Sequence, residues 1–219
     1  MTVKGFIFDL DGVIVDTASH HFAAWQILAE DLGVPFDEKD NELLKGVSRV
    51  DSLEFILNKG GLVLDSQTKL RLMEKKNAHY LSLSASIGVN DALPGIVEFI
   101  RELKSRGMQI ALGSSSKNAH QILGQLELTD AFDAIVDGNR ITLSKPDPEV
   151  FMLGARLMGL TPSECLVFED AKAGVEAAIN GGFQVVGVGN EIELSDADAI
   201  IDDFEKMNWE RMQNLLSNS

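Results

Sequence analysis

Hydrophobic and polar positions follow two different periods along this chain, and the change of period divides it into regions. Residues 3–8 are almost all apolar, which is typical of a parallel strand that is covered on both faces. From there to about residue 86, apolar residues recur at steps of three and four, and no strand pattern interrupts them. The stripe that marks the first of these helices comprises Phe22, Trp25, Leu28, Ala29 and Leu32, and Gly33 ends it.

Two more helices are predicted before residue 86. Ser48 followed by Asp51 resembles a helix start, and the glycine pair at 60–61 would end that helix. The pattern over about residues 66–81 predicts the next helix. We therefore expect residues 17–86 to form a wholly helical insertion that lies over the carboxyl end of the first strand.

Beyond residue 86 the pattern alternates between helices and short strands. Strands are predicted at residues 108–112, 134–137, 165–168, 184–188 and, more weakly, 199–201, and helices at about 96–107, 117–127, 148–158 and 173–181. Repeated strand–helix units imply a parallel, right-handed, doubly wound sheet of the Rossmann-like α/β class. The expected organisation is an α/β core domain, residues 1–16 and 87–219, and an all-helical cap domain, residues 17–86.

Composition and charge restrict the partners of the molecule. Its 219 residues carry a net charge of −15, which argues against a nucleic-acid surface, because such surfaces are built from clustered Lys and Arg. No apolar stretch is long enough to span a bilayer and no signal segment precedes the first strand, so we expect a cytoplasmic protein without a membrane partner. A monomer is the expected state, since no coiled-coil repeat demands association. The one cysteine, Cys165, lies in an apolar run and is predicted to be a buried structural thiol.

Two carboxylates follow the first strand. The strand runs into Asp9-Leu10-Asp11-Gly12, and ligands of open α/β folds bind at the carboxyl ends of strands. A carboxylate can attack phosphorus to form an aspartyl-phosphate, and Asp9 is the candidate nucleophile. Asp11 is the candidate acid/base, which protonates the departing oxygen and later deprotonates the incoming hydroxyl. Because a carboxylate repels a phosphate dianion, the site needs a hard cation such as Mg²⁺ and further carboxylates to hold it.

Three later strand ends carry the other groups that such a site needs. The strand at 108–112 opens into residues 113–118, which supply hydroxyls, backbone amides and a lysine for phosphoryl oxygens. Lys145 precedes a rigid turn and would neutralise Asp9 and the phosphate, while Glu169 and Asp170 follow the strand at 165–168 as metal carboxylates. Each feature alone also fits a helix cap, a surface lysine or acids at a helix N-terminus. Their order along the chain favours one site.

This order of motifs resembles the haloacid dehalogenase superfamily of aspartyl-phosphate enzymes, and the resemblance covers the whole chain. The motifs are Asp9-Leu10-Asp11-Gly12, Ser114, Lys145 and Glu169-Asp170. The resemblance implies a Mg²⁺ ion bound by Asp9, the backbone carbonyl of Asp11, Glu169 and Asp170. It also implies that the insertion at 17–86 is a helical cap that closes over the substrate.

The cap sequence resembles the β-phosphoglucomutase family within that superfamily. Three features carry the resemblance: the loop at 44–52, the spacing from Thr17 to His21, and the Lys76-Asn77 pair. It implies that Arg49 holds the phosphate that is not transferred and that His21 and Lys76 tie cap closure to the placement of Asp11. The substrate contacts implied by the resemblance are Lys45, Gly46, Ser52, Ser114, Ser116, Lys117, Asn118 and Lys145.

Several readings of the cap remain open from the residues alone. His20 lies beside His21, so the choice of imidazole is undecided, and the cap cations also fit a solvated helix face. Trp25 is predicted to belong to the cap core and not to be a sugar platform, because it falls on the apolar stripe of its helix. Gly113, Ser115 and Ala171 depart from the family pattern.

The expected activity is that of a Mg²⁺-dependent phosphomutase acting on a small sugar phosphate. It would interconvert β-D-glucose 1-phosphate and glucose 6-phosphate through an aspartyl-phosphate and β-glucose 1,6-bisphosphate. The alternatives are a sugar-phosphate phosphatase with the same core and a non-catalytic protein that binds a sugar phosphate. The identity of the sugar stays open, because stereochemistry is read by contacts that are distributed over the chain.

Overall fold

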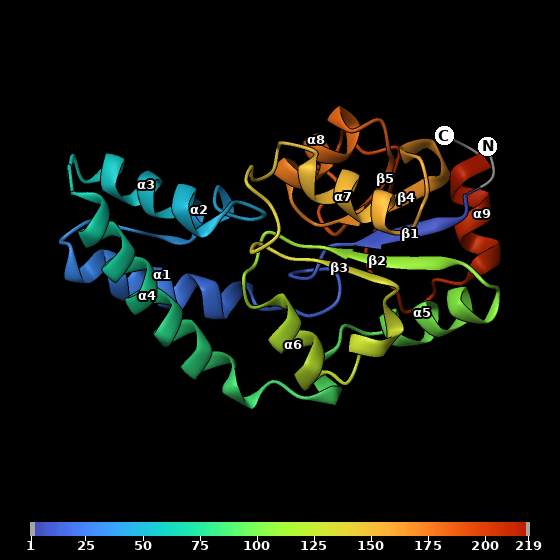
Figure 1. Ribbon diagram of the computed structural model, residues 1–219, viewed down its shortest axis with the longest axis horizontal. Coiled ribbons are helices and arrows are strands. Elements are labelled where there is room, and N and C mark those ends of the chain that lie inside the picture. Colours follow the sequence, from blue (N-terminus) through green and yellow to red (C-terminus); the bar gives the residue numbers. More distant parts are fainter. Residues whose placement is uncertain (1–2, 218–219) are drawn as a thin grey trace.

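A six-stranded parallel sheet forms the centre of the molecule. The computed structural model describes residues 3–217 (Figure 1). Neighbouring strands are all parallel and lie in the order β3-β2-β1-β4-β5-β6. The chain therefore builds outward from β1 in one direction, returns to its other side with β4, and confirms the predicted doubly wound sheet. The strands are β1 (Gly5–Phe8), β2 (Gln109–Gly113), β3 (Ala134–Val136), β4 (Cys165–Glu169), β5 (Gln184–Val188) and β6 (Ala199–Ile201).

Helices cover both faces of this sheet. On one face lie α5 (Ile96–Ser105), α6 (Ala119–Gln125) and α9 (Trp209–Ser217), and on the other lie α7 (Glu149–Leu157) and α8 (Lys172–Asn180) (Figure 1). The sequence pattern predicts all of these except α9. Short 3₁₀ turns occur at Ser84–Ser86, Val89–Asp91, Thr129–Ala131 and Pro162–Glu164.

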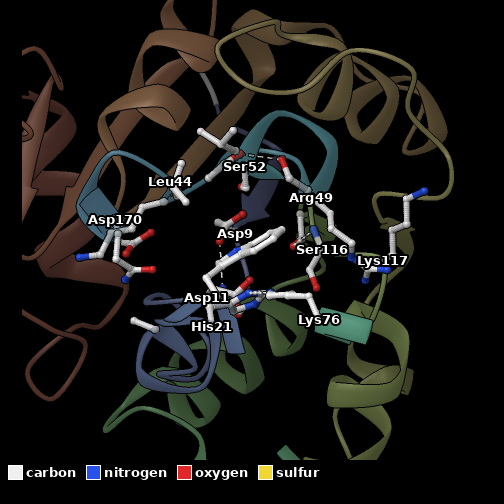
Figure 2. A pocket seen from close by; sticks show the side chains of 18 residues that line it. Asp9, Asp11, His21, Leu44, Arg49, Ser52, Lys76, Ser116, Lys117 and Asp170 are labelled. Atoms are coloured by element: carbon white, nitrogen blue, oxygen red, sulfur yellow. Dashed lines mark hydrogen bonds and ion pairs between the residues drawn. The ribbon is translucent and has the colours of Figure 1, made fainter. Parts of the chain in front are cut away.

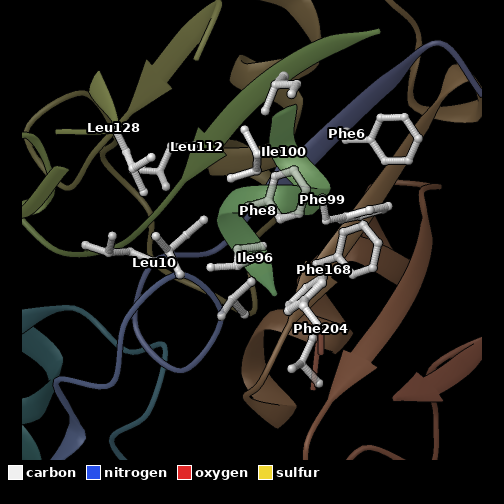
Figure 3. Close-up of a cluster of buried hydrophobic side chains, with 14 of the residues drawn as sticks. Phe6, Phe8, Leu10, Ile96, Phe99, Ile100, Leu112, Leu128, Phe168 and Phe204 are labelled. Carbon is white, nitrogen blue, oxygen red and sulfur yellow. The ribbon is translucent and has the colours of Figure 1, made fainter. Parts of the chain in front are cut away.

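Aromatic side chains fix the strands that lead to the carboxylates. Phe8 of β1 stacks on Phe168 of β4 with ring centroids 5.0 Å apart, and Phe99 of α5 packs edge-on against both rings (Figure 3). The preceding residues of these strands, Ile7 and Val167, are fully buried on the opposite face. Because both faces are packed, the ends of β1 and β4 are held rigidly relative to each other.

The remaining helices are grouped beside the carboxyl ends of the strands (Figure 1). Their buried apolar residues, among them Trp25, Leu28, Leu53 and Ile56, form a cluster of their own that is separate from the two sheet clusters. The Ser48 side chain accepts a hydrogen bond from Asp51 N at the start of the third helix, as the sequence predicts. The four helices are α1 (Ala18–Asp31), α2 (Glu38–Glu42), α3 (Arg49–Lys59) and α4 (Ser66–Leu83).

None of the helices within residues 3–217 combines the length and the apolar character that crossing a membrane requires. Cys165 is fully buried in β4, and burial raises the pKa of its thiol to about 12. The thiol therefore packs in the core, as predicted, and is not activated as a nucleophile.

Candidate active site

A pocket lies between the carboxyl ends of the central strands and helices α1–α4 (Figure 2). It joins residues that are far apart in sequence, and it contains most of the predicted site residues. Of these it is lined by Asp9, Asp11, His21, Lys45, Gly46, Arg49, Ser52, Lys76, Ser114, Ser116, Lys117 and Asp170. Ala18, Trp25, Asn41, Leu44, Val47 and Ser115 complete the lining and were not among the predicted contacts.

Lys145 and Glu169 are buried and do not line the pocket, and Lys145 holds Asp9 in place. Lys145 Nζ donates to Asp9 Oδ1 at 2.5 Å and to Glu169 Oε1 at 2.6 Å. Burial disfavours the charge of this lysine, but the two carboxylates outweigh burial and raise the pKa of Lys145. Asp9 and Glu169 end strands that flank the reversal of strand order, which is where ligands of doubly wound sheets bind.

Three carboxylates at these strand ends are arranged as metal ligands. One oxygen from each of Asp9, Glu169 and Asp170 lies within 4.8 Å of the others. Burial raises the pKa of Asp9 to about 7 and the pKa of Asp170 well above its ordinary value, and the neighbouring acids add to both shifts. This concentration of buried negative charge fits a hard divalent cation.

Gly12 makes room for this cluster. Its φ of +81° lies in the left-handed region, and a Cβ at this position would lie 2.1 Å from Asp170 Oδ2. Only glycine combines this backbone conformation with so close an approach. The glycine of the Asp9–Gly12 motif therefore has a structural explanation in the position of Asp170.

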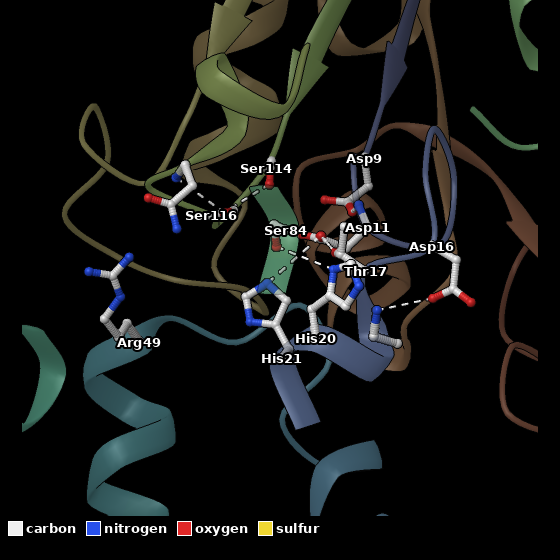
Figure 4. A network of polar contacts seen from close by, with 12 residues as sticks. Asp9, Asp11, Asp16, Thr17, His20, His21, Arg49, Ser84, Ser114 and Ser116 are labelled. Carbon is white, nitrogen blue, oxygen red and sulfur yellow. Dashed lines mark hydrogen bonds and ion pairs between the residues drawn. The ribbon is translucent and has the colours of Figure 1, made fainter. Parts of the chain in front are cut away.

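The carboxylate of Asp11 does not belong to the cluster of Asp9, Glu169 and Asp170. Its backbone N–H donates to Asp9 Oδ2 at 2.9 Å, while its side chain accepts a hydrogen bond from the hydroxyl of Thr17 (Figure 4). Burial raises the pKa of Asp11, although the hydrogen bond from Thr17 opposes this effect. Asp11 thus lies beside Asp9, and its carboxylate is separate from the three-carboxylate cluster.

The geometry distinguishes the two neighbouring histidines. His21 Nδ1 is 2.9 Å from Lys76 Nζ, and its Nε2 lies 3.8 Å from Asp11 Oδ1. His20 Nδ1 is instead 3.2 Å from the hydroxyl of Ser84 (Figure 4). His21 is therefore the imidazole between the cap lysine and the second acid. Burial and the charge of Lys76 lower the pKa of His21 well below its ordinary value, so it is neutral.

Two cations of the cap face the pocket without a carboxylate partner. No carboxylate within residues 3–217 forms an ion pair with Lys76 or Arg49. The Lys76 ammonium lies over the rings of Trp25, at 4.5 Å, and Tyr80, at 5.2 Å. Burial and the charge of Arg49 lower the pKa of Lys76 to about 7. Trp25 belongs to the cap core, as predicted, and also forms part of the pocket wall.

Asn77 connects the cap to the core and was not among the predicted site residues. Its Oδ1 accepts from Arg49 Nη2 at 2.8 Å and from Asn118 Nδ2 at 2.9 Å. Asn118 does not line the pocket, and its side chain contacts the cap through Asn77. The only sequence signal for Asn77 is its place next to Lys76.

The serine loop after β2 holds itself together by hydrogen bonds and lies at the pocket. Ser114 Oγ accepts from Ser116 N at 3.1 Å, and Ser116 Oγ accepts from Asn118 N at 3.3 Å, so both hydroxyls hold the loop at the start of α6. Both residues also line the pocket. Of the other predicted contacts, Lys45 forms an ion pair with Glu42 at 2.7 Å, and Ser52 is buried at the pocket wall.

Comparison with known proteins places this geometry among phosphoryl-transfer enzymes. A family model described as haloacid dehalogenase-like hydrolase matches residues 3–182. Over 201 residues the chain is 43% identical to the β-phosphoglucomutase of Bacillus subtilis (strain 168), covering 91% of this chain and 89% of the relative. Over 205 residues it is 32% identical to a phosphorylated carbohydrates phosphatase of Thermotoga maritima, covering 91% of each. A crystal structure of a β-phosphoglucomutase from Clostridium difficile matches with a TM-score of 0.96 at 40% identity, covering 99% of this chain and 98% of that chain.

Proposed function

The chain belongs to the haloacid dehalogenase-like hydrolase family, and from that membership we propose that it is a phosphomutase that interconverts β-D-glucose 1-phosphate and D-glucose 6-phosphate. The reaction passes through an aspartyl-phosphate on the enzyme and β-glucose 1,6-bisphosphate. The enzyme is thus an isomerase of the intramolecular phosphotransferase type. The relative named β-phosphoglucomutase, at 43% identity over most of both chains, supports this assignment.

Asp9 and Asp11 divide the chemistry between them. A carboxylate oxygen of Asp9 bonds to phosphorus, the bond from phosphorus to the sugar oxygen breaks, and Asp11 donates a proton to that oxygen. In the reverse transfer a sugar hydroxyl bonds to phosphorus, its proton passes to Asp11, and the bond from phosphorus to Asp9 breaks. The raised pKa of Asp11 suits a group that must carry this proton.

The metal in this proposal is Mg²⁺. The carboxylates of Asp9, Glu169 and Asp170, together with the backbone carbonyl of Asp11, would hold it, since these are the hard oxygen ligands that Mg²⁺ prefers. When bound, the ion neutralises charge on the transferring phosphoryl group. Lys145 holds Asp9 by a hydrogen bond and would neutralise both Asp9 and the phosphate.

The cap cations bind the phosphate that is not being transferred. Arg49 presents parallel N–H donors that fit two phosphate oxygens, and Lys76 presents a point charge. The hydrogen bond from Lys76 to His21, which faces Asp11, links the arrival of that phosphate to the placement of the acid/base.

The other predicted contacts complete the substrate shell. We assign residues 1–16 and 87–219 to the core domain, residues 17–86 to the cap domain, and a small sugar phosphate as the partner. Cytoplasmic location and a monomeric state remain predictions. The shell residues that line the pocket are Ser114, Ser116 and Lys117 from the core and Lys45, Gly46 and Ser52 from the cap. Asn118 adjoins this shell through its hydrogen bond to Asn77.

Asp9, Asp11, Arg49 and Lys76 all line one pocket, and this observation is the main support for the proposed function. A transfer site and a second anion site face each other across a space shared by core and cap. The test supplies purified enzyme with β-glucose 1-phosphate, a catalytic amount of the 1,6-bisphosphate and Mg²⁺, and follows glucose 6-phosphate. Steady release of inorganic phosphate without isomerised sugar phosphate would contradict the mutase assignment.

A sugar-phosphate phosphatase is the second candidate. The Thermotoga maritima relative, which is named a phosphorylated carbohydrates phosphatase, favours it. Phosphate release measured over a panel of hexose phosphates separates the two activities. A phosphatase releases one phosphate for each substrate consumed, whereas a mutase consumes β-glucose 1-phosphate with little release.

A further inference from the structure

Two serine hydroxyls of the core reach across to the cap. Ser115 Oγ donates to the backbone carbonyl of Gly46 at 2.8 Å, and Ser144 Oγ donates to Asp51 Oδ2 at 2.5 Å. Ser115 follows β2 and Ser144 precedes Lys145, so the two donors belong to different core loops. Both acceptors belong to residues 46–51, the segment that carries Arg49.

The hydroxyl of Ser115 forms a different kind of hydrogen bond from the hydroxyls of Ser114 and Ser116. The Ser114 and Ser116 side chains accept hydrogen bonds from backbone N–H groups of their own loop. Ser115 points out of the loop and donates to the cap instead, while it also lines the pocket. The role of a helix cap or loop staple therefore does not account for Ser115, which is one of the departures from the family pattern.

Segment 46–51 is seated on the core at the first of these contacts. Gly46 has a φ of +72°, and a Cβ added there would lie 3.4 Å from the Cβ of Ala171 and 3.6 Å from Lys145 Cδ. At the second contact Asp51 also accepts from Ser48 Oγ at 2.6 Å, which ties the first turn of α3 together. Two hydrogen bonds thus fix the turn before α3 and the first turn of α3 over the pocket.

We propose that Ser115 and Ser144 are positioning residues that hold segment 46–51 closed and thereby determine whether the aspartyl-phosphate is transferred to sugar or to water. This inference rests on the proposed mutase function. In both fates an oxygen bonds to phosphorus, the bond to Asp9 breaks, and the attacking hydroxyl or water gives its proton to Asp11. Closure decides between them because it excludes water from the pocket.

The test measures inorganic phosphate released per glucose 6-phosphate formed for Ser115→Ala, Ser144→Ala and the double variant. Loss of one hydrogen bond should raise this ratio about fivefold, and loss of both should raise it more than tenfold. Ser105→Ala is the matched control, because Ser105 Oγ also donates to a backbone carbonyl, Glu102 O at 2.7 Å, within α5. A ratio in the double variant equal to that of the control overturns the inference.

A second measurement does not depend on activity. Hydrogen exchange of the backbone amides of residues 46–51 should be faster in the double variant than in the wild type and the Ser105→Ala control, without added ligand. Unchanged exchange contradicts the proposed contacts. If the wild type forms no glucose 6-phosphate, the proposed function fails, and the exchange rates still decide whether the two serines hold the segment.

Discussion

A lysine is buried in the core and another in the cap, and their surroundings shift the two pKa values in opposite directions. Lys145 in the core touches two carboxylates, which raise its pKa. Lys76 in the cap is only 3% exposed, yet it contacts an imidazole and two aromatic rings, and burial lowers its pKa to about 7. The positive charge of the core lysine is balanced by two carboxylates of the protein. Within residues 3–217 no carboxylate forms an ion pair with the cap lysine.

This difference separates two tasks of the site. Lys145 donates hydrogen bonds to Asp9 and Glu169 and so holds Asp9 in place. A buried ammonium without an anion is costly, and the cost is recovered only when a ligand supplies the negative charge. In the proposed function the cap accordingly receives a phosphate, while the core transfers one.

The largest expected effect comes from removing the nucleophile on the core side. Asp9→Asn should lower turnover by about 10⁴-fold or more, because no other group can form the phosphoenzyme. The measurement is glucose 6-phosphate formation with bisphosphate and Mg²⁺ present. Asp203→Asn, an exposed acid that accepts from Glu205 N, serves as the control. Turnover of Asp9→Asn within tenfold of this control would contradict the role of Asp9.

Replacing each lysine by methionine should change the free energy of unfolding in opposite ways. Lys145→Met leaves Asp9 and Glu169 uncompensated and should destabilise the metal-free protein by about 3–5 kcal/mol. Lys76→Met removes an unpaired buried charge and should leave stability unchanged or raise it, while it raises KM for the sugar phosphate. Denaturant unfolding in chelator checks both variants. Equal destabilisation by the two would remove the distinction between core and cap.

Asp9 should make the metal-free protein less stable as the pH rises. Burial raises the pKa of Asp9 from 3.8 to about 7, so the folded protein binds more protons than the unfolded chain between these values. The stabilising contribution is complete below pH 3.8 and is lost as the pH rises through about 7. We expect this carboxyl to contribute a decrease on the order of 2–3 kcal/mol between pH 5 and pH 8.

The same experiment with Mg²⁺ sharpens this prediction. Metal binding requires deprotonated ligands, so Mg²⁺ should stabilise the protein more at pH 8 than at pH 5. The measurement is unfolding at the two pH values with chelator or with Mg²⁺. In Asp9→Asn the decrease in chelator should be smaller. An equal decrease in both proteins would show that Asp9 is not its source.

More of the core's site geometry than of the cap's could be predicted from the sequence. Asp9, Lys145 and Glu169 each follow or adjoin a recognisable strand or turn, and parallel strands bring such residues to one edge by geometry alone. The apolar stripes likewise predicted most of the helices. The short helix Trp209–Ser217 was missed because its turns carry polar residues between few apolar ones.

The cap contacts depend on packing between distant segments, which no local pattern contains. Nothing in the spacing of residues 76–80 indicates that Lys76 would lack a carboxylate or that Asn77 would join Arg49 to Asn118. The choice between His20 and His21 likewise required the positions of Ser84 and Lys76. Ser115 departs from the family pattern, and only the structure shows that its hydroxyl contacts Gly46.

The most direct test of the division between a transferring core and a receiving cap compares two substrates with Arg49→Ala. Arg49 makes no ion pair within residues 3–217 and is proposed to bind only the second phosphate. We predict that isomerisation of β-glucose 1-phosphate falls by about tenfold to a hundredfold, the range for a charge-assisted bidentate contact. Hydrolysis of p-nitrophenyl phosphate, which has one phosphate, should fall far less. An equal loss on both substrates would contradict the account.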